Sequence, residues 1–208
     1  MKKSFRTKME NVTYRIFGFK RYNLDGTFFE RVDFVIIHLD KRRKTFYSAF
    51  FDEVPTEKEL STRCHPTCDP LCTTCTKSHL ISTKNINDLS NLFKTNWPTS
   101  FTIHSPRFVK FSLTDHVEDG RPPKTFKRDR RPTRGEIHKL MEALNEVLRR
   151  HRIIDRSRPY LATPANPNVD SIYQKTINGN LGFNLIFQAN RAIIDPKDPT
   201  LGVLYVIN

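Results

Sequence analysis

The stretch from Thr133 to His151 carries the clearest structural pattern in the chain and reads TRGEIHKLMEALNEVLRRH. Thr133 and Glu136 form a capping box, in which the hydroxyl and the carboxylate each satisfy a free amide of the first helical turn. Apolar side chains then recur at helical spacing and form one continuous stripe, made of Ile137, Leu140, Met141, Leu144, Val147 and Leu148. We therefore predict an amphipathic helix over residues 134–151, about 27 Å long at 1.5 Å per residue, with its stripe in the core.

The segment before this helix, residues 114–134, changes from acidic to strongly basic along its length. Only Phe126 is apolar in its second half, so we expect an exposed basic loop that does not pack by itself. Cations also gather at the C-terminal end of the helix, where they suit the helix dipole. The side chains that we expect to contact nucleic-acid phosphates are Arg121, Lys124, Lys127, Arg128, Arg130, Arg131, Arg134, Arg149, Arg150 and Arg152.

Residues 12–51 are rich in strand-forming side chains and predict an antiparallel meander, with turns at residues 23–26 and 40–44. His38 ends the most apolar of these strands, and we expect a hydrogen-bonded sheet histidine rather than a catalyst. Further along, residues 85–94 predict a short helix, and residues 100–113 predict extended structure.

The last fifty residues or so predict β structure. Residues 169–177 and 181–189 flank Asn178-Gly179-Asn180, a strong hairpin signal. Residues 201–207 predict a final, buried strand. The chain is thus expected to be an α+β protein with antiparallel sheets, divided into an N-terminal part (1–113), a basic linker (114–134) and a C-terminal part (135–208). These parts could also form one domain.

All four cysteines of the chain lie within one short loop, together with two histidines. Cys72 and Cys75 have the spacing of a zinc knuckle, in which two thiolates reach one tetrahedral ion. The candidates for the four ligand positions are Cys64, His65, Cys68, Cys72, Cys75 and His79. Their spacing predicts a structural zinc site but leaves the choice of four ligands open. A closed, thiolate-rich shell has no free position for a substrate.

The spacing of the cysteines allows two other interpretations. Two disulfides would require an oxidising compartment, whereas the basic start of the chain has no signal-peptide pattern. Cys68, Cys72 and Cys75 also match the spacing that holds a [4Fe–4S] cluster in radical S-adenosylmethionine enzymes. Such enzymes have βα alternation and glycine-rich loops, whereas this chain has only 7 glycines. Zinc is therefore the expected cofactor.

Composition narrows the possible functions. The formal net charge is +13 for 208 residues, which suggests a polyanionic partner. No apolar run reaches the roughly 20 residues of a membrane helix, so no membrane partner is expected. No nucleotide-binding or hydrolase motif occurs. Asp115, His116 and Glu118 could be imagined as a metal-dependent nuclease site, but such groups often occur by chance in basic loops. We expect a non-catalytic protein.

Two hypotheses of different class remain. The first is a zinc-stabilised protein that binds DNA or RNA through its basic loop. The second is a protein-interaction adaptor or host-factor antagonist, in which residues 127–131 would act as a nuclear localisation patch.

A compact basic chain with one Cys/His loop at residues 64–79 and no enzymatic motif resembles small non-structural proteins of DNA viruses, those of densoviruses in particular. The resemblance implies a role in viral genome replication or regulation in the nucleus. It rests on size, charge and the Cys64–His79 loop, and it transfers no functional residue to this chain.

Overall fold

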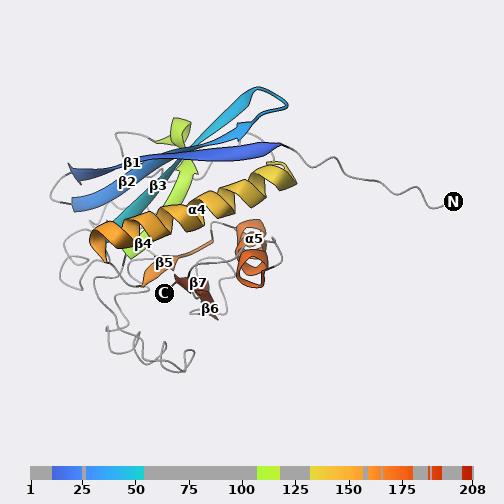
Figure 1. Cartoon of the computed structure of the whole chain (residues 1–208). Coiled ribbons are helices and arrows are strands. Elements are labelled where there is room, and N and C mark those ends of the chain that lie inside the picture. Colours follow the sequence, from blue (N-terminus) through green and yellow to red (C-terminus); the bar gives the residue numbers. More distant parts are fainter. Residues whose placement is uncertain are drawn as a thin grey trace.

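One mixed β-sheet with two helices on one side forms the described part of the protein (Figure 1). The structure is a computed structural model and describes residues 11–24, 27–53, 107–117, 132–156, 159–164, 166–179, 187, 189–193 and 203–207. The predicted α+β class is confirmed for these residues. The Cys/His loop at 64–79, the predicted helix at 85–94 and the basic residues 121–131 lie outside them.

The sheet contains seven described strands in the order β1-β2-β3-β4-β5-β7-β6. Their bounds are β1 Val12–Leu24, β2 Thr27–His38, β3 Arg43–Glu53, β4 Arg107–Leu113, β5 Tyr160–Ala162, β6 Ala189–Ile193 and β7 Val203–Ile207. A short 3₁₀ helix, η1, follows β4 at Thr114–His116. The predicted meander of residues 12–51 is confirmed as β1–β3, and the predicted last strand as β7.

The expectation of purely antiparallel sheets is wrong at one place. β4 and β5 are parallel neighbours, whereas every other pair of described neighbours is antiparallel. Parallel strands need a crossover connection of a dozen or more residues. The connection here contains α4, Arg134–Asp155, so the long helix links the two halves of one sheet.

Helix α4 matches its prediction closely. The Thr133 hydroxyl accepts a hydrogen bond from the Glu136 amide at 3.2 Å, as expected for the first half of a capping box. The helix runs one turn beyond the predicted end and stops where Arg156 takes a left-handed conformation with φ 51°. The stripe residues Leu140, Met141, Leu144, Val147 and Leu148 are buried.

This stripe packs on the sheet face formed by alternate residues of β2 and β3. Val32, Phe34 and Ile36 of β2 belong to one buried cluster with α4, and partly buried Tyr14 and Ile16 of β1 pack against it. The second helix, α5 at Pro167–Ile177, packs through Tyr173 and Ile177 on β5 and β7 on the same side of the sheet. Phe50 and Phe108 lie on the other face by strand register, and both are buried as well.

Helix α5 contradicts the predicted strand at residues 169–177. The Asn166 side chain accepts hydrogen bonds from the amides of Asn168 and Val169, and Pro167 occupies the first turn. Proline suits this position because its missing N–H is one of the unpaired donors of a helix start. Asn178 and Gly179 end the helix instead of forming a hairpin turn, and Gly179 has φ 71°. Most of the predicted strand 181–189 lies outside the described residues.

Candidate functional site

The sequence-predicted nucleic-acid residues that the structure describes all belong to α4. Arg134 is exposed at its first position. Near the other end, Glu146 accepts hydrogen bonds from Arg149 Nε at 2.7 Å and from Arg150 Nε at 2.8 Å. These two guanidinium groups hold the pKa of the Glu146 carboxyl near 2. The outer side of α4 therefore carries paired charges rather than a purely basic strip.

Arg152 takes a different position. Its guanidinium carbon lies 5.2 Å from the centre of the Phe187 ring, in a cation–π contact. The remaining predicted cations lie outside the described residues; they are Arg121, Lys124, Lys127, Arg128, Arg130 and Arg131. The metal-ligand candidates also lie outside the described residues; they are Cys64, His65, Cys68, Cys72, Cys75 and His79. Asp115 and His116 lie on η1, and the only group within the described residues that could hold a metal does not include them.

A buried ion pair joins β2 to the C-terminal end of α4. His151 Nε2 lies 2.5 Å from Glu30 Oε2, and the His151 side chain is 0% exposed. Because a carboxylate only accepts, Nε2 carries the proton that is shared with Glu30. Arg21 of β1 donates to the other oxygen of Glu30 at 2.8 Å. The hydrogen bond from His151 and the contact with Arg21 outweigh burial and lower the pKa of Glu30 to about 2.

Aromatic rings enclose this pair. The His151 ring stacks on Phe51 with 3.8 Å between ring centres, and Nδ1 lies 3.1 Å from the Tyr160 hydroxyl. Burial raises the pKa of Tyr160 well above its usual value. A histidine that is fully buried and engaged at both ring nitrogens cannot exchange protons with a substrate, so its position suits a structural role.

Glu30, His151 and Asp155 each offer one ligand atom, and these atoms lie within 4.8 Å of one another. The geometry nevertheless fits an ion-pair network better than a metal centre. Arg107 Nε lies 2.9 Å from Asp155 Oδ2, and Arg21 Nη2 lies 2.8 Å from Glu30 Oε1. Each carboxylate is therefore already paired with a guanidinium group. A divalent cation at this place would lie next to two arginines.

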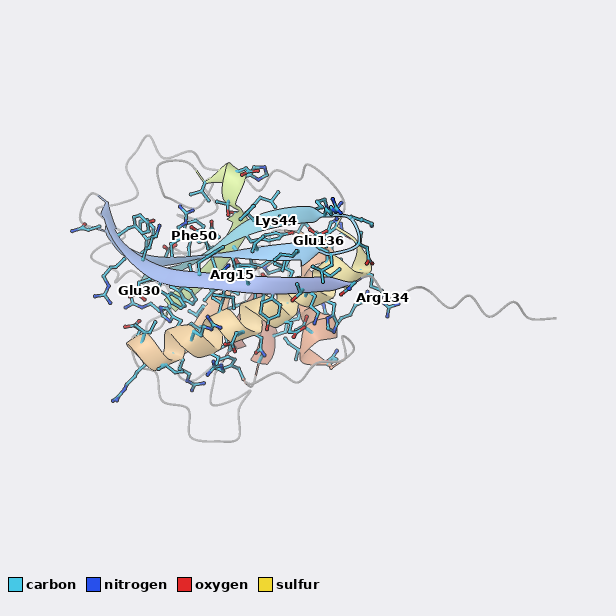
Figure 2. All side chains as sticks on the ribbon, turned by 45° about the horizontal axis from the view of Figure 1, so that its top comes forward. Arg15, Glu30, Lys44, Phe50, Arg134 and Glu136 are labelled. Carbon is cyan, nitrogen blue, oxygen red and sulfur yellow. The ribbon has the colours of Figure 1, made fainter. Side chains whose placement is uncertain are left out.

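A second buried pair joins the same two elements at their other ends. His38 of β2 is 2% exposed, and its Nε2 lies 3.5 Å from Oε2 of fully buried Glu136. Tyr47 donates a hydrogen bond to Glu136 Oε1 at 3.1 Å, and Arg43 Nη2 lies 3.0 Å from His38 Nε2. The expectation of a hydrogen-bonded sheet histidine at position 38 is confirmed. Figure 2 shows Glu30 and Glu136 at opposite ends of α4.

A third polar group holds α5 against the edge of the sheet. Both oxygens of Asp170 accept hydrogen bonds from Arg191 of β6 at 3.1 Å, and the Tyr205 hydroxyl of β7 also donates to Asp170. Burial of Asp170 favours its protonated form, but the bonds from Arg191 and Tyr205 prevail and lower its pKa. All three polar groups thus connect helices to strands.

A cavity of about 80 Å³ lies between the sheet and the two helices. Its walls are almost entirely apolar and include Phe111, Leu144, Tyr173 and Phe187. Small-molecule sites usually enclose about 300–1,000 Å³ and contain several converging polar groups. The described walls of this cavity offer almost no polar group that could orient a ligand.

A second set of exposed cations lies on or next to the sheet face that points away from α4, whereas Arg21 and Arg191 pair with Glu30 and Asp170 on the helix side. Arg15 and Lys20 of β1 and Lys44 of β3 are exposed there, and Arg42 is exposed at the β2–β3 turn. Arg15 and Lys20 were not among the predicted contact residues. The alternation of β1 places Arg15 opposite the apolar face, whereas Lys20 reaches the outer face only through the register shift between Ile16 and Phe19.

No family model, no curated protein and no solved structure matches this chain. The resemblance to viral non-structural proteins therefore stays a prediction from the sequence. Neither α4 nor α5 is long and apolar enough to cross a membrane.

Proposed function

We propose that this chain is a nucleic-acid-binding protein that holds its partner mainly through lysine and arginine contacts to phosphates. The observation that carries the proposal is the distribution of charge. The net charge is +13, and Arg15, Lys20 and Lys44 are exposed on one face of the sheet. A surface of this kind raises the local concentration of polyanions and releases counterions when it binds them.

The described acids do little to offset these cations, because most of them are already in ion pairs within the fold. A cationic or histidine side chain lies within ion-pair distance of the carboxylates of Glu30, Asp33, Asp52, Glu136, Glu142, Glu146, Asp155 and Asp170. On the outer face of the meander, Asp33 faces Arg31 at 2.7 Å. The excess positive charge is therefore left on the exposed side chains.

Zinc binding by the Cys/His loop is part of the proposal and is supported by sequence spacing alone. Four ligands from Cys64, His65, Cys68, Cys72, Cys75 and His79 would supply a closed structural site. Zinc bound in this way contributes folding free energy to a loop that has few apolar residues. The basic residues 121–131 are proposed to add phosphate contacts.

The test is a fluorescence-anisotropy titration of labelled single- and double-stranded oligonucleotides with the full chain over a series of salt concentrations. If about seven phosphates are neutralised, the logarithm of affinity should fall with the logarithm of salt at a slope of roughly −5 to −6. The triple substitution Arg15→Gln, Lys20→Gln and Lys44→Gln should weaken binding and reduce this slope. Neutralising residues 121–131 should do the same.

Lys175→Gln is the matched control, because Lys175 is an exposed cation on α5, across the sheet from the basic face. It should leave the affinity within about twofold of the wild type, since one remote charge is largely screened. Absence of binding to both oligonucleotides at low salt would contradict the proposal and direct the search to protein partners.

A further inference from the structure

Two phenylalanines interrupt the row of cations on the outer face of the meander. Phe17 of β1 is 39% exposed and Phe46 of β3 is 44% exposed. They are the only exposed phenylalanines among the described residues whose burial is known. Exposed aromatic rings next to cations are the side chains on which nucleic-acid bases stack.

Strand register places these rings and the cations on one face. Arg15 lies opposite Val35, and Val35 lies opposite Phe46, so Arg15 and Phe46 occupy one row across three strands. The next row places Lys44 opposite Ile37. Figure 2 shows Lys44 across the strands from α4. We call this surface the outer patch, formed by Arg15, Phe17, Lys20, Lys44 and Phe46.

Phe17 belongs to the same face although the β1–β2 register shifts between Ile16 and Phe19. The Arg15 guanidinium carbon lies 5.7 Å from the centre of the Phe17 ring, which places both side chains together. A bulge at this point adds one residue to β1, so Lys20, opposite Arg31, continues the outer row. Cation and ring thus alternate along β1 as Arg15, Phe17 and Lys20.

Several other phenylalanines of the meander are buried. Phe50 lies four residues after Phe46 on β3 and therefore on the same face, but it is 0% exposed. Phe34 and Phe51 on the helix side are buried as well. The exposure of Phe17 and Phe46 is therefore local to the part of the outer face near the β2–β3 turn.

We propose that the outer patch binds single-stranded nucleic acid, with Phe17 and Phe46 stacking on bases and with Arg15, Lys20 and Lys44 contacting the backbone. Stacking needs unpaired bases, because a duplex presents phosphates and groove edges rather than base faces. Open sheets with exposed aromatic rings between cations are suited to this mode, which tolerates any sequence. The inference rests on the proposed nucleic-acid function and adds strand type and location to it.

Charge complementarity favours a polyanion over an apolar protein partner at this patch. The acids nearest to it are already engaged: Asp33 accepts from Arg31 and from the Ser48 hydroxyl, and Asp40 at the turn accepts from the Asn11 amide. On β2, buried Val35 lies between Arg15 and Phe46, so the exposed part of the patch consists of the two rings and the cations. A partner must therefore offer flat, stackable groups and negative charge together, as a nucleic-acid strand does.

The experiment compares Phe46→Ala and Phe17→Ala with wild-type protein in anisotropy titrations of a single-stranded oligonucleotide and of its duplex. Each substitution should weaken single-strand binding by roughly 5- to 100-fold, the range found for loss of one base–aromatic stack. Duplex binding should change less than about twofold. Phe46→Trp should retain single-strand binding, and its fluorescence should fall on titration when compared in a Trp97→Phe background, since Trp97 is the only native tryptophan.

Phe46→Leu and Ile193→Ala separate stacking from apolar contact. Leucine keeps an apolar side chain at position 46 but has no ring, so it should behave like alanine. Ile193 is 58% exposed on β6 and lies on the helix side of the sheet, so its truncation should leave affinity unchanged. Thermal unfolding of each variant checks that the fold persists.

The possible failures are distinguishable. If the phenylalanine variants bind single strands as wild type does while the charge variants lose affinity, the stacking inference is overturned and the proposed function stands. A wild-type preference for duplex would also overturn it. If wild-type protein binds neither strand type, the proposed function fails as well.

Discussion

Glu30 Oε2 and His151 Nε2 lie 2.5 Å apart in the folded protein although 121 positions separate the two residues in the sequence. At the other end of the same two elements, His38 and Glu136 form a pair with the residue types exchanged. Strand β2 thus presents a glutamate and then a histidine toward α4, and α4 presents a glutamate and then a histidine toward β2. The antiparallel run of the two elements brings each acid to a base.

Element lengths make this arrangement possible. The stretch from Glu30 to His38 extends about 26 Å at roughly 3.3 Å per strand residue, and the stretch from Glu136 to His151 extends about 22 Å at 1.5 Å per helix residue. The order also suits the helix dipole, which favours negative charge at the first turn and positive charge near the last. The two pairs therefore match the direction and the axial position that α4 has on the sheet.

The first prediction concerns the Glu30–His151 pair. His151→Ala should lower the free energy of unfolding by about 3–5 kcal/mol, because it removes a fully buried stacked ring and leaves a buried carboxylate without one of its partners. Urea unfolding followed by circular dichroism measures the change. Asp115→Asn, an exposed site on η1, serves as the control and should stay within about 0.5 kcal/mol of the wild type. A similar small effect of His151→Ala would show that the pair does not stabilise the fold.

The second prediction concerns acid stability. The pKa of Glu30 is about 2 in the folded protein, below its ordinary value of 4.5. The ionised carboxylate therefore stabilises the fold above pH 4.5, by an amount on the order of 3 kcal/mol, and this contribution is lost as the pH falls from about 4.5 toward 2.

Replacing Glu30 with Gln should lower the free energy of unfolding at pH 7 and reduce its dependence on pH between about 4.5 and 2. Unfolding titrations at several pH values with wild type and variant provide the measurement. Parallel curves for the two proteins over this interval would rule out the depressed pKa as a source of acid sensitivity.

The third prediction concerns the attachment of α5. Asp170→Ala removes the acceptor of two hydrogen bonds from Arg191 and of the bond from the Tyr205 hydroxyl. Loss of the carboxylate partner of the Arg191 guanidinium, and of one of the two acceptors of the buried Tyr205 hydroxyl, should cost about 2–4 kcal/mol. Hydrogen exchange should accelerate in α5 and β6 more than in β1–β3. Ser171→Ala, at an exposed neighbouring position of α5, should leave the exchange pattern unchanged.

Local patterns were sufficient to predict the meander and α4. The apolar run of strand-forming residues from Val32 to His38 identified a buried strand, and the capping residues with the apolar stripe identified α4. The prediction failed at residues 169–177, where Val169, Ile172 and Thr176 favour strands by local preference. The helix-start signal at Asn166 and Pro167 was present in the sequence, but the hairpin signal at Asn178-Gly179-Asn180 favoured a strand before it.

Contacts between distant segments could not be predicted in the same way. Neither the parallel pairing of β4 with β5 nor the pair Glu30–His151 follows from any local spacing, because both depend on how α4 lies on the sheet. The outer patch is an intermediate case. The alternation of β1 contained the information that Arg15 and Phe17 face away from the core. Charge density alone, in contrast, predicts nucleic-acid contacts at residues 121–134.

The fourth prediction concerns the Cys/His loop, where the spacing predicts one zinc ion per chain. Protein purified without chelator should contain zinc close to a 1:1 ratio by elemental analysis, and its thiols should react with a thiol reagent only after the metal is removed. Chelation should lower the melting temperature, since bound metal contributes to folding free energy. Cys72→Ser should abolish zinc retention, whereas His65→Ala and His79→Ala test the two histidines for membership in the ligand set. Two disulfides and no zinc in protein purified without added reductant would contradict the prediction. Iron and labile sulfide in place of zinc would also contradict it.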